Sequence, residues 1–252
     1  MPLSLCPACR LPDRSVVTNL PCEECLDSLL AAPRICPVCL GFACADDACA
    51  RPWLAVNGED GRLRFDSVTA AYLSIGPGAR VLKSWKTSPS PSLTRHLQAG
   101  VQPHLAQFEA ETPLLLIPIP QSARRRMELA GGSALRLCAM IREARRNPRD
   151  RILDLLDVGR REHAQAKSKG DERYSRRAAI QARPAEALEE VDHRKPRFLL
   201  VDDFLTSGTT LRTAAAVVRE TFENLDRFDG GNTRLDVFVL GFRPALFRDA
   251  TD

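Results

Sequence analysis

One stretch of the sequence decides the fold: Leu199-Leu200-Val201-Asp202-Asp203-Phe204-Leu205-Thr206-Ser207-Gly208-Thr209-Thr210-Leu211. An apolar strand leads into two adjacent acids, a short turn rich in hydroxyl side chains follows, and a helix begins after the turn. Strand, turn and helix in this order indicate a parallel α/β sheet, in which ligands bind at the carboxyl ends of the strands. We therefore expect both the fold and the functional site to be organised around this stretch.

The turn between the strand and the helix suits a phosphate group. Backbone N–H groups at a helix N-terminus point outward and carry a partial positive charge. Gly208 permits a close approach of the backbone, and further donors are the hydroxyls of Thr206, Ser207, Thr209 and Thr210. Asp202 and Asp203 repel phosphate, so we expect them beside it, where they accept hydrogen bonds from the vicinal hydroxyls of a ribose. The alternative is that the two acids merely cap the helix.

Alternating strands and helices surround this stretch. Apolar patterning predicts strands over 68–75, 114–119, 152–156, 198–201 and 237–241, and helices over 79–85, 93–108, 134–145 and 209–222. On the helix at 134–145 we expect Leu135, Cys138, Met140 and Ile141 to face inward. The runs at 114–119 and 198–201 are continuously apolar, as in parallel strands that are buried on both faces. The predicted fold class is therefore α/β, with a parallel sheet flanked by helices.

Eight of the nine cysteines lie between positions 6 and 49, and their spacing predicts metal binding. They form the pairs Cys6 and Cys9, Cys22 and Cys25, Cys36 and Cys39, and Cys44 and Cys49. A two-residue spacer lets two thiolates converge on one ion, and soft thiolates select zinc. We expect two structural zinc ions, each bound by four cysteines taken in chain order, with an interleaved pairing as the alternative. Disulfides, free thiols and an iron–sulfur cluster are the other chemistries open to this region.

The sequence divides into three predicted regions: a double zinc ribbon over 1–55, a connector over 56–112 and an α/β domain over 113–252. Hydrophobic residues make up 44% and charged residues 27%, as in ordinary globular proteins. The chain has no apolar run of about 18 residues, so we expect no membrane insertion. The N-terminus lacks the pattern of a secretory signal, which predicts a cytoplasmic protein. The net charge of +4 suits an anionic ligand or nucleic acid without requiring either.

The stretch at 199–211 resembles the phosphoribosyl pyrophosphate (PRPP) motif of type I phosphoribosyltransferases: aliphatic residues, two acids, two spacers and then Thr-Ser-Gly-Thr-Thr. Cysteine pairs followed by a PRPP motif resemble the ComF family. Its members join an amino-terminal zinc ribbon to a phosphoribosyltransferase-like domain, and some are linked to DNA uptake in competent bacteria. Further similarity lies in the lysine-containing segment at 81–86, the Pro-x-Pro strand end at 117–120, the basic run at 124–126, and the charged segment with Arg160, Arg161, Gln165 and Arg173.

The resemblance implies a site for PRPP or a nucleotide-like small molecule. Asp202 and Asp203 would hold the ribose hydroxyls, and the 5′-phosphate would be wrapped by Thr206, Ser207, Gly208, Thr209 and Thr210. Pyrophosphate would be neutralised by Mg²⁺ and by Arg124, Arg125 and Arg126, in a transfer of phosphoribosyl to an acceptor. No side chain in the sequence is placed as a general base for that transfer.

One departure from the family favours a different function. Where the family has Arg-Gly-Phe-Asn, this chain has Ala130-Gly131-Gly132-Ser133, which removes a charge-assisted contact to the pyrophosphate. The alternative hypothesis is a non-catalytic adaptor, whose zinc ribbon and Arg-rich surface bind single-stranded DNA or a DNA-uptake helicase. A purely structural scaffold is the third hypothesis.

Overall fold

The structure, a computed structural model, describes residues 4–13, 20–42, 44, 49, 65–121, 132–158, 180–182, 197–223 and 234–244. Its centre is a five-stranded sheet of order β3-β9-β8-β4-β5, in which every neighbouring pair is parallel. The strands are β3 (Ser67–Leu73), β4 (Leu114–Pro118), β5 (Arg151–Ile152), β8 (Arg197–Leu205) and β9 (Leu235–Phe242). The predicted α/β class with a parallel sheet is confirmed.

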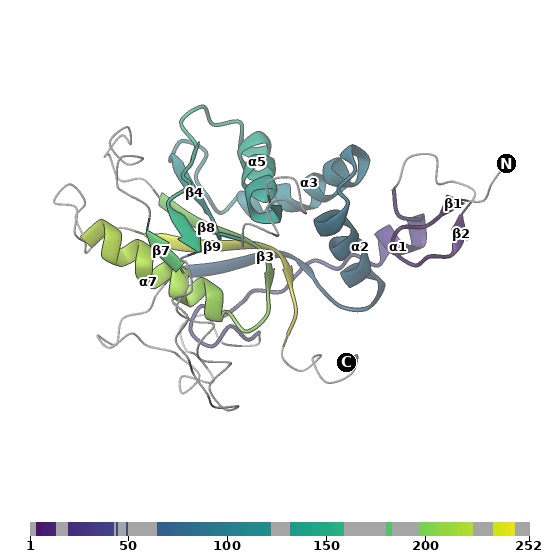
Figure 1. The fold of residues 1–252 in the computed structure, drawn as a ribbon, viewed down its shortest axis with the longest axis horizontal. Helices are drawn as coiled ribbons and strands as arrows, with labels where there is room; N and C mark the ends of the chain where they lie inside the picture. The colour runs from purple at the N-terminus through teal and green to yellow at the C-terminus, as the bar shows by residue number, and fades with distance from the viewer. Residues whose placement is uncertain are drawn as a thin grey trace.

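Helices cover both faces of the sheet (Figure 1). One face carries α2 (Gly76–Thr87), α3 (Pro91–Leu105) and α5 (Ser133–Arg145), and the other carries α7 (Thr209–Glu223). Both faces of the central strands are consequently buried: every residue of β4 and of β9 is buried. This double coverage explains why these strands read as continuous apolar runs rather than as alternating ones.

Two short antiparallel pairs lie outside the main sheet. β1 (Ser4–Leu5) pairs with β2 (Pro12–Asp13), and α1 (Glu23–Asp27) follows them. Figure 1 shows these N-terminal elements beside α2. The second pair is formed by β6 (Leu156–Val158) and β7 (Ile180–Ala182).

The segment after α1 lies along the free edge of the sheet. Its backbone runs antiparallel to β3: Leu73 N–H donates to the Leu30 carbonyl at 2.8 Å, and Ala32 N–H donates to the Ala71 carbonyl at 3.1 Å. An isolated bridge between Ile35 and Val68 continues the contact. This pairing covers the backbone groups of an edge strand and attaches the N-terminal region to the sheet.

Two local predictions for α5 and the segment that follows it were wrong. The strand expected over 152–156 is divided, since β5 ends at Ile152 and β6 begins at Leu156. In α5, Leu135 is 42% exposed instead of facing inward, whereas Leu137 is fully buried. Cys138, Met140 and Ile141 are buried as expected.

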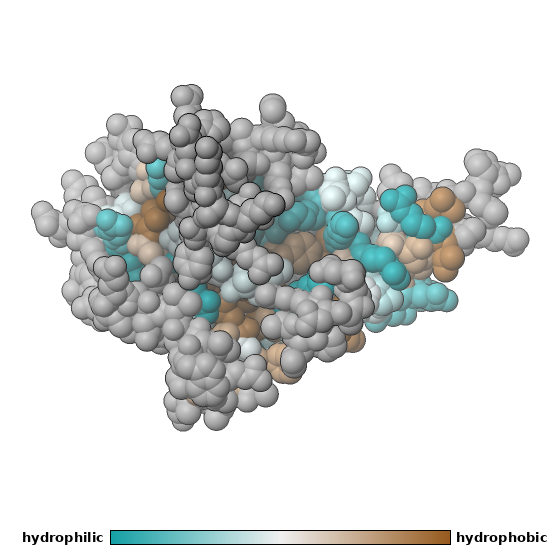
Figure 2. Space-filling view, turned by 60° about the horizontal axis from the view of Figure 1, so that its bottom comes forward, coloured by the Kyte–Doolittle hydropathy of each residue, from teal (hydrophilic) through white to brown (hydrophobic). Residues whose placement is uncertain are grey.

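Some apolar side chains remain at the surface of the N-terminal elements. Leu5 is 55% exposed and Leu11 is 61% exposed. Figure 2 shows hydrophobic and hydrophilic residues side by side at this end of the molecule. Within the described ranges, no helix combines the length and the apolar character needed to cross a bilayer.

Candidate functional site

Strand β8 carries both acids of the predicted site inside the strand. The expected strand ended at Val201, whereas β8 continues to Leu205 because β9 stays paired with it as far as Phe242. On the other side, the ladder with β4 ends where Pro118 lies opposite Val201. Beyond that point, side chains from other elements reach the β8 acids.

The Asp203 carboxylate is buried at a junction of three elements. It is 4% exposed, and its Oδ2 atom lies 2.8 Å from Nζ of Lys86, at the end of α2. The hydroxyl of Ser133, the first residue of α5, donates to the same oxygen. Gln121, which follows β4, donates through Nε2 to Ser133 Oγ at 2.7 Å and to Asp203 Oδ2 at 3.4 Å. These contacts hold the carboxylate in position without a ligand.

Lys86 is itself held from two sides. Its ammonium lies 5.3 Å from the centroid of the Phe204 ring, a distance that allows a cation–π interaction. Its carbonyl oxygen accepts a hydrogen bond from Nη2 of Arg136 at 2.7 Å. The guanidinium of Arg136 in turn lies 5.3 Å from the Trp85 ring. The positive charge of Lys86 is therefore fixed beside the acids and still partly open to solvent.

Asp202 differs from Asp203 in its electrostatics. Its side chain is half-buried, and its Oδ1 atom accepts the N–H of Asp203 at 2.8 Å. Desolvation, followed by repulsion from the Asp203 charge, raises the pKa of Asp202 to about 8. Lys86 and the Asp203 N–H act in the opposite direction but are outweighed. The surroundings of Asp202 in the ligand-free protein therefore favour its neutral form more than those of an ordinary aspartate do.

The predicted phosphate turn lies directly after these acids. Thr206, Ser207 and Thr210 are exposed, whereas Gly208 is buried. Gly208 has a φ of 73°, in the left-handed region that favours glycine. The N–H of Thr209 donates to the Ser207 hydroxyl oxygen at 3.5 Å. The described contacts of the two carboxylates include those with the Asp203 N–H and with the Ser133 hydroxyl, and the N–H at the start of α7 is contacted by Ser207.

The eight N-terminal cysteines form two tetrads in chain order, as predicted, and the interleaved pairing is wrong. One tetrad consists of Cys6, Cys9, Cys22 and Cys25, and the other of Cys36, Cys39, Cys44 and Cys49; the sulfurs of each set lie within 4.8 Å of one another. We call them the first and second tetrads.

The spacing of the sulfurs fits zinc. The Sγ atoms are 4.0 Å apart for Cys6 and Cys25, 3.8 Å for Cys9 and Cys22, and 3.6 Å for Cys39 and Cys44. Thiolates arranged tetrahedrally at about 2.3 Å from a zinc ion are about 3.8 Å apart. A disulfide needs sulfurs at about 2.05 Å, and all these cysteines are free, so the disulfide alternative does not fit.

Backbone donors prepare the first tetrad for a metal. The sulfur of Cys6 accepts N–H groups from Ala8 at 3.4 Å, Cys9 at 3.5 Å and Cys22 at 3.3 Å. Burial acts to raise the pKa of Cys6, but these N–H groups lower it to about 6. Cys6 thus favours the thiolate, which is the form that binds metal, whereas desolvation raises the pKa of Cys22 and Cys25 in the same tetrad.

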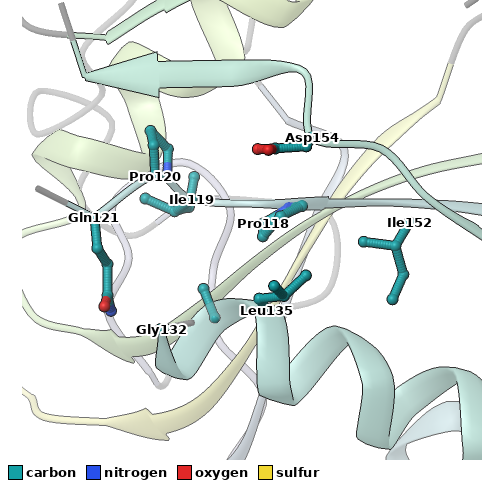
Figure 3. A pocket seen from close by; sticks show the side chains of 9 residues that line it. Pro118, Ile119, Pro120, Gln121, Gly132, Leu135, Ile152 and Asp154 are labelled. Atoms are coloured by element: carbon teal, nitrogen blue, oxygen red, sulfur yellow. The ribbon is translucent and has the colours of Figure 1, made fainter. Parts of the chain in front are cut away.

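A cavity of about 260 Å³ lies beside the acids, at the ends of β4 and β5 and the start of α5. Figure 3 shows the Asp154 carboxylate on one side and Leu135 and Gly132 of the α5 end on the other. Gln121 connects the cavity to Asp203. The described lining is apolar apart from Gln121 and Asp154 and has no basic side chain, so it is poorly suited to pyrophosphate.

Several predicted residues lie outside the described part of the chain. These are the basic residues Arg124, Arg125 and Arg126, the segment with Arg160, Arg161, Gln165 and Arg173, and the loop residues Ala130 and Gly131. Their roles remain predictions.

Sequence reasoning missed three residues of the site: Lys86, Gln121 and Ser133. Gln121 could have been found from its place just after an apolar parallel strand, at the edge where ligands bind. Ser133 was noted only as part of a departure from the family, and Lys86 only as part of a similar segment. Their convergence on Asp203 depends on how α2, β4 and α5 pack, which no local pattern contains.

Comparison with known proteins gives no match: no protein-family model, no curated protein and no solved structure matches this chain. The resemblance to the ComF family therefore rests on the residues of the chain itself, together with the two cysteine tetrads and the parallel sheet that the structure contains.

Proposed function

We propose that the carboxyl edge of the sheet binds a ribose 5-phosphate, in PRPP or in a nucleotide-like molecule. The observation that carries the proposal is the placement of Asp202 and Asp203 at the end of β8, followed at once by an open, hydroxyl-rich turn and the start of α7.

The turn supplies what a 5′-phosphate requires. The helix that follows is 15 residues long and has no acidic residue in its first turn, so nothing there opposes an anion. The exposed hydroxyls of Thr206, Ser207 and Thr210 provide donors beside the backbone N–H groups. Gly208 supplies the left-handed backbone conformation that the turn requires.

The acids supply what the sugar requires. A ribose presents two adjacent hydroxyls, and each can donate to a carboxylate oxygen. Asp203 is held ready by Lys86 and Ser133. Asp202 is only half-buried and remains accessible. We expect ligand binding to favour the ionised form of Asp202, because a carboxylate accepts stronger hydrogen bonds than a neutral acid.

Phosphoribosyl transfer is the activity that best suits such a ligand. The bond between the anomeric carbon and pyrophosphate breaks, and a bond to an acceptor nucleophile forms. Lys86 is the described cation closest to the acids and would attract the pyrophosphate group of PRPP. Mg²⁺, when it accompanies PRPP, would neutralise part of the pyrophosphate charge. Arg124, Arg125 and Arg126 are the further candidates for this role.

Isothermal titration calorimetry tests the binding proposal. Ribose 5-phosphate, and PRPP with Mg²⁺, should both bind the wild-type protein, and Asp202→Asn/Asp203→Asn should weaken binding at least about tenfold, because hydrogen bonds to charged groups contribute about 1.5–3 kcal/mol each. Glu220→Gln, which changes an exposed acid of α7, is the matched control and should leave the affinity unchanged. Wild-type protein that binds neither ligand would remove the proposal.

Turnover and the adaptor hypothesis need separate measurements. Release of pyrophosphate from PRPP, followed by ³¹P NMR with candidate acceptors, reports on transfer. Fluorescence anisotropy with a labelled single-stranded oligonucleotide reports on the alternative partner. Tight oligonucleotide binding without any ribose 5-phosphate binding would favour the adaptor; binding of DNA or of a helicase otherwise stays a prediction.

A further inference from the structure

The two zinc knuckles of this chain are built alike. Cys6-Pro7-Ala8-Cys9 and Cys36-Pro37-Val38-Cys39 share one sequence pattern. In each, the N–H of the residue after the second cysteine donates to the carbonyl of the first at 2.9 Å. That residue has a left-handed backbone in both knuckles, with φ of 66° at Arg10 and 58° at Leu40.

The two equivalent residues have different surroundings. Arg10 is exposed, whereas Leu40 is buried, with 7% of its surface accessible. Leu40 packs in the core on the α7 side of the sheet, together with Leu205 and Leu211, which flank the phosphate turn. A knuckle needs no buried side chain at this position, as Arg10 demonstrates. The apolar residue at position 40 therefore calls for an explanation outside the metal site.

Leu40 lies directly against the phosphate turn. A Cβ atom built on Gly208 would come within 2.0 Å of Leu40 Cδ1, so the leucine side chain occupies the space above that glycine. A second contact joins the same two regions: Nη2 of Arg212, in the first turn of α7, donates to the Val38 carbonyl at 3.2 Å. The knuckle thus contacts both the turn and the helix that follows it.

We propose that Leu40 is a positioning residue for the phosphate turn, and that metal bound at the second tetrad strengthens ligand binding through it. The left-handed backbone at Leu40 is held by the knuckle, and a knuckle of this kind folds around its metal. Without the metal, Leu40 and the Val38 carbonyl are released, and the turn at 206–210 samples more conformations. The apparent affinity then falls in proportion to the fraction of molecules with an ordered turn.

The described residues of the first tetrad pack elsewhere. Cys6, Ala8 and Cys25 pack in the core on the opposite face, with α2, α3 and α5. The two metal sites of one chain therefore provide an internal comparison. Because coupling is reciprocal, a ligand in the turn should also retain metal at the second tetrad and leave metal at the first unaffected.

A pair of glycine substitutions tests the positioning role without touching a metal ligand. Leu40→Gly removes the side chain and suits the left-handed backbone, and Arg10→Gly makes the same change in the first knuckle. In Leu40→Gly we expect faster amide hydrogen exchange over 206–212, unchanged exchange in β9, and affinity for ribose 5-phosphate about tenfold lower. Leu40→Met, which keeps a large apolar side chain, should retain the wild-type exchange over 206–212 and the wild-type affinity. Arg10→Gly should change neither property.

A second measurement follows the metal. Zinc transfer to a colorimetric chelator should have two phases, and ribose 5-phosphate should slow only one of them. Cys9→Ser/Cys22→Ser should retain the ligand-sensitive phase, and Cys39→Ser/Cys44→Ser should lose it. A ligand effect on both phases or on neither would overturn the coupling.

The ligand half of this inference rests on the proposed function, and the results distinguish the two. If the wild-type protein binds no ribose 5-phosphate, the proposed function fails, while hydrogen exchange at 206–212 still decides whether Leu40 orders the turn. If the wild-type protein binds and Leu40→Gly matches it in both exchange and affinity, the coupling is wrong and the proposed function stands.

Discussion

At the scale of the residue, the ionised form of Asp202 is the form that we expect to bind the ligand, and it is also the form that lowers the stability of the ligand-free protein. Its pKa is raised to about 8 by desolvation and by the neighbouring Asp203 charge. Below about pH 4 the group is protonated in the folded and the unfolded chain alike, so its pKa shift has no effect on stability. As the pH rises from about 4 to 8, the unfolded chain releases the proton first, and the folded state loses stability relative to it.

Asp202→Asn should therefore stabilise the ligand-free protein, and more so at pH 8 than at pH 5. At pH 8 we expect a Tm at least about 2 °C above that of the wild type, since 1 kcal/mol shifts the Tm of a protein of this size by about 2–4 °C. Differential scanning fluorimetry at the two pH values measures the difference. A gain that is equal at both, or a loss at pH 8, would contradict the raised pKa of Asp202.

The residues of the site divide into those that the sequence could identify and those that it could not. Asp202, Asp203 and the turn residues form one continuous motif whose chemistry is local, so their pattern predicts them. Lys86 and Ser133 act through a partner, Asp203, that is distant in the sequence. The position of Leu40 against Gly208 is likewise a contact between distant segments, which only the packed structure reveals.

At the scale of the element, α5 shows why apolar periodicity was not sufficient. Three of the four residues expected to face inward do so, but Leu135 faces outward and Leu137 replaces it. The polar contacts of the helix fix its rotation: Ser133 bonds Asp203, and Arg136 bonds the Lys86 carbonyl. Both partners lie on other elements, so the sequence of the helix alone does not determine which of its residues face the core.

The two leucines of α5 should consequently differ in their contribution to stability. Leu137→Ala leaves a cavity in a fully buried position and should lower the free energy of unfolding by about 3 kcal/mol. Leu135→Ala removes a side chain that is 42% exposed and should lower it by less than about 1 kcal/mol. Urea denaturation followed by circular dichroism provides both values. Similar losses for the two variants would show that the helix is rotated from the described orientation.

The strands likewise include features that the sequence predicts and features that it does not. β4, β8 and β9 were predicted because strands buried on both faces must be apolar throughout. The edge pairing of the segment at 30–35 with β3 uses backbone groups, which carry no side-chain signal. The end of β8 was placed too early because the acids interrupt its apolar run, although the backbone ladder with β9 continues to Leu205.

At the scale of the whole molecule, the charged groups at the carboxyl ends and at the amino ends of the parallel strands differ in their access to solvent. We call these two ends of the sheet its carboxyl edge and its amino edge. The carboxyl edge holds Asp202 and Lys86, which have access to solvent, and the exposed turn. At the amino edge, Asp236 is fully buried, and its carboxylate bonds Arg197, Ser67 and Arg234, the last at 3.2 Å. The amino edge thus joins the starts of β3, β8 and β9 in one closed network, with no acid left available to a ligand among the described residues of that network.

This arrangement predicts that stability and ligand binding can be changed independently. Asp236→Asn leaves the mostly buried Arg197 without its counter-charge, and removal of one partner from a buried pair costs about 3–5 kcal/mol. We expect the low end, about 3 kcal/mol, because Arg234 keeps access to solvent. The affinity of the folded protein for ribose 5-phosphate should remain within about twofold of wild type, since sites without shared partners act independently.

The pair Glu111 and Arg149 provides the matched control, since its atoms are 3.7 Å apart and Glu111 is almost fully exposed. Glu111→Gln should leave both stability and affinity close to wild type, because exposed ion pairs contribute little. Urea denaturation and calorimetry on the three proteins measure both quantities. If Asp236→Asn lost affinity as well as stability, stability and ligand binding would not be independent. The site would then depend on the rigidity of the whole sheet rather than on the local junction of α2, α5 and β8.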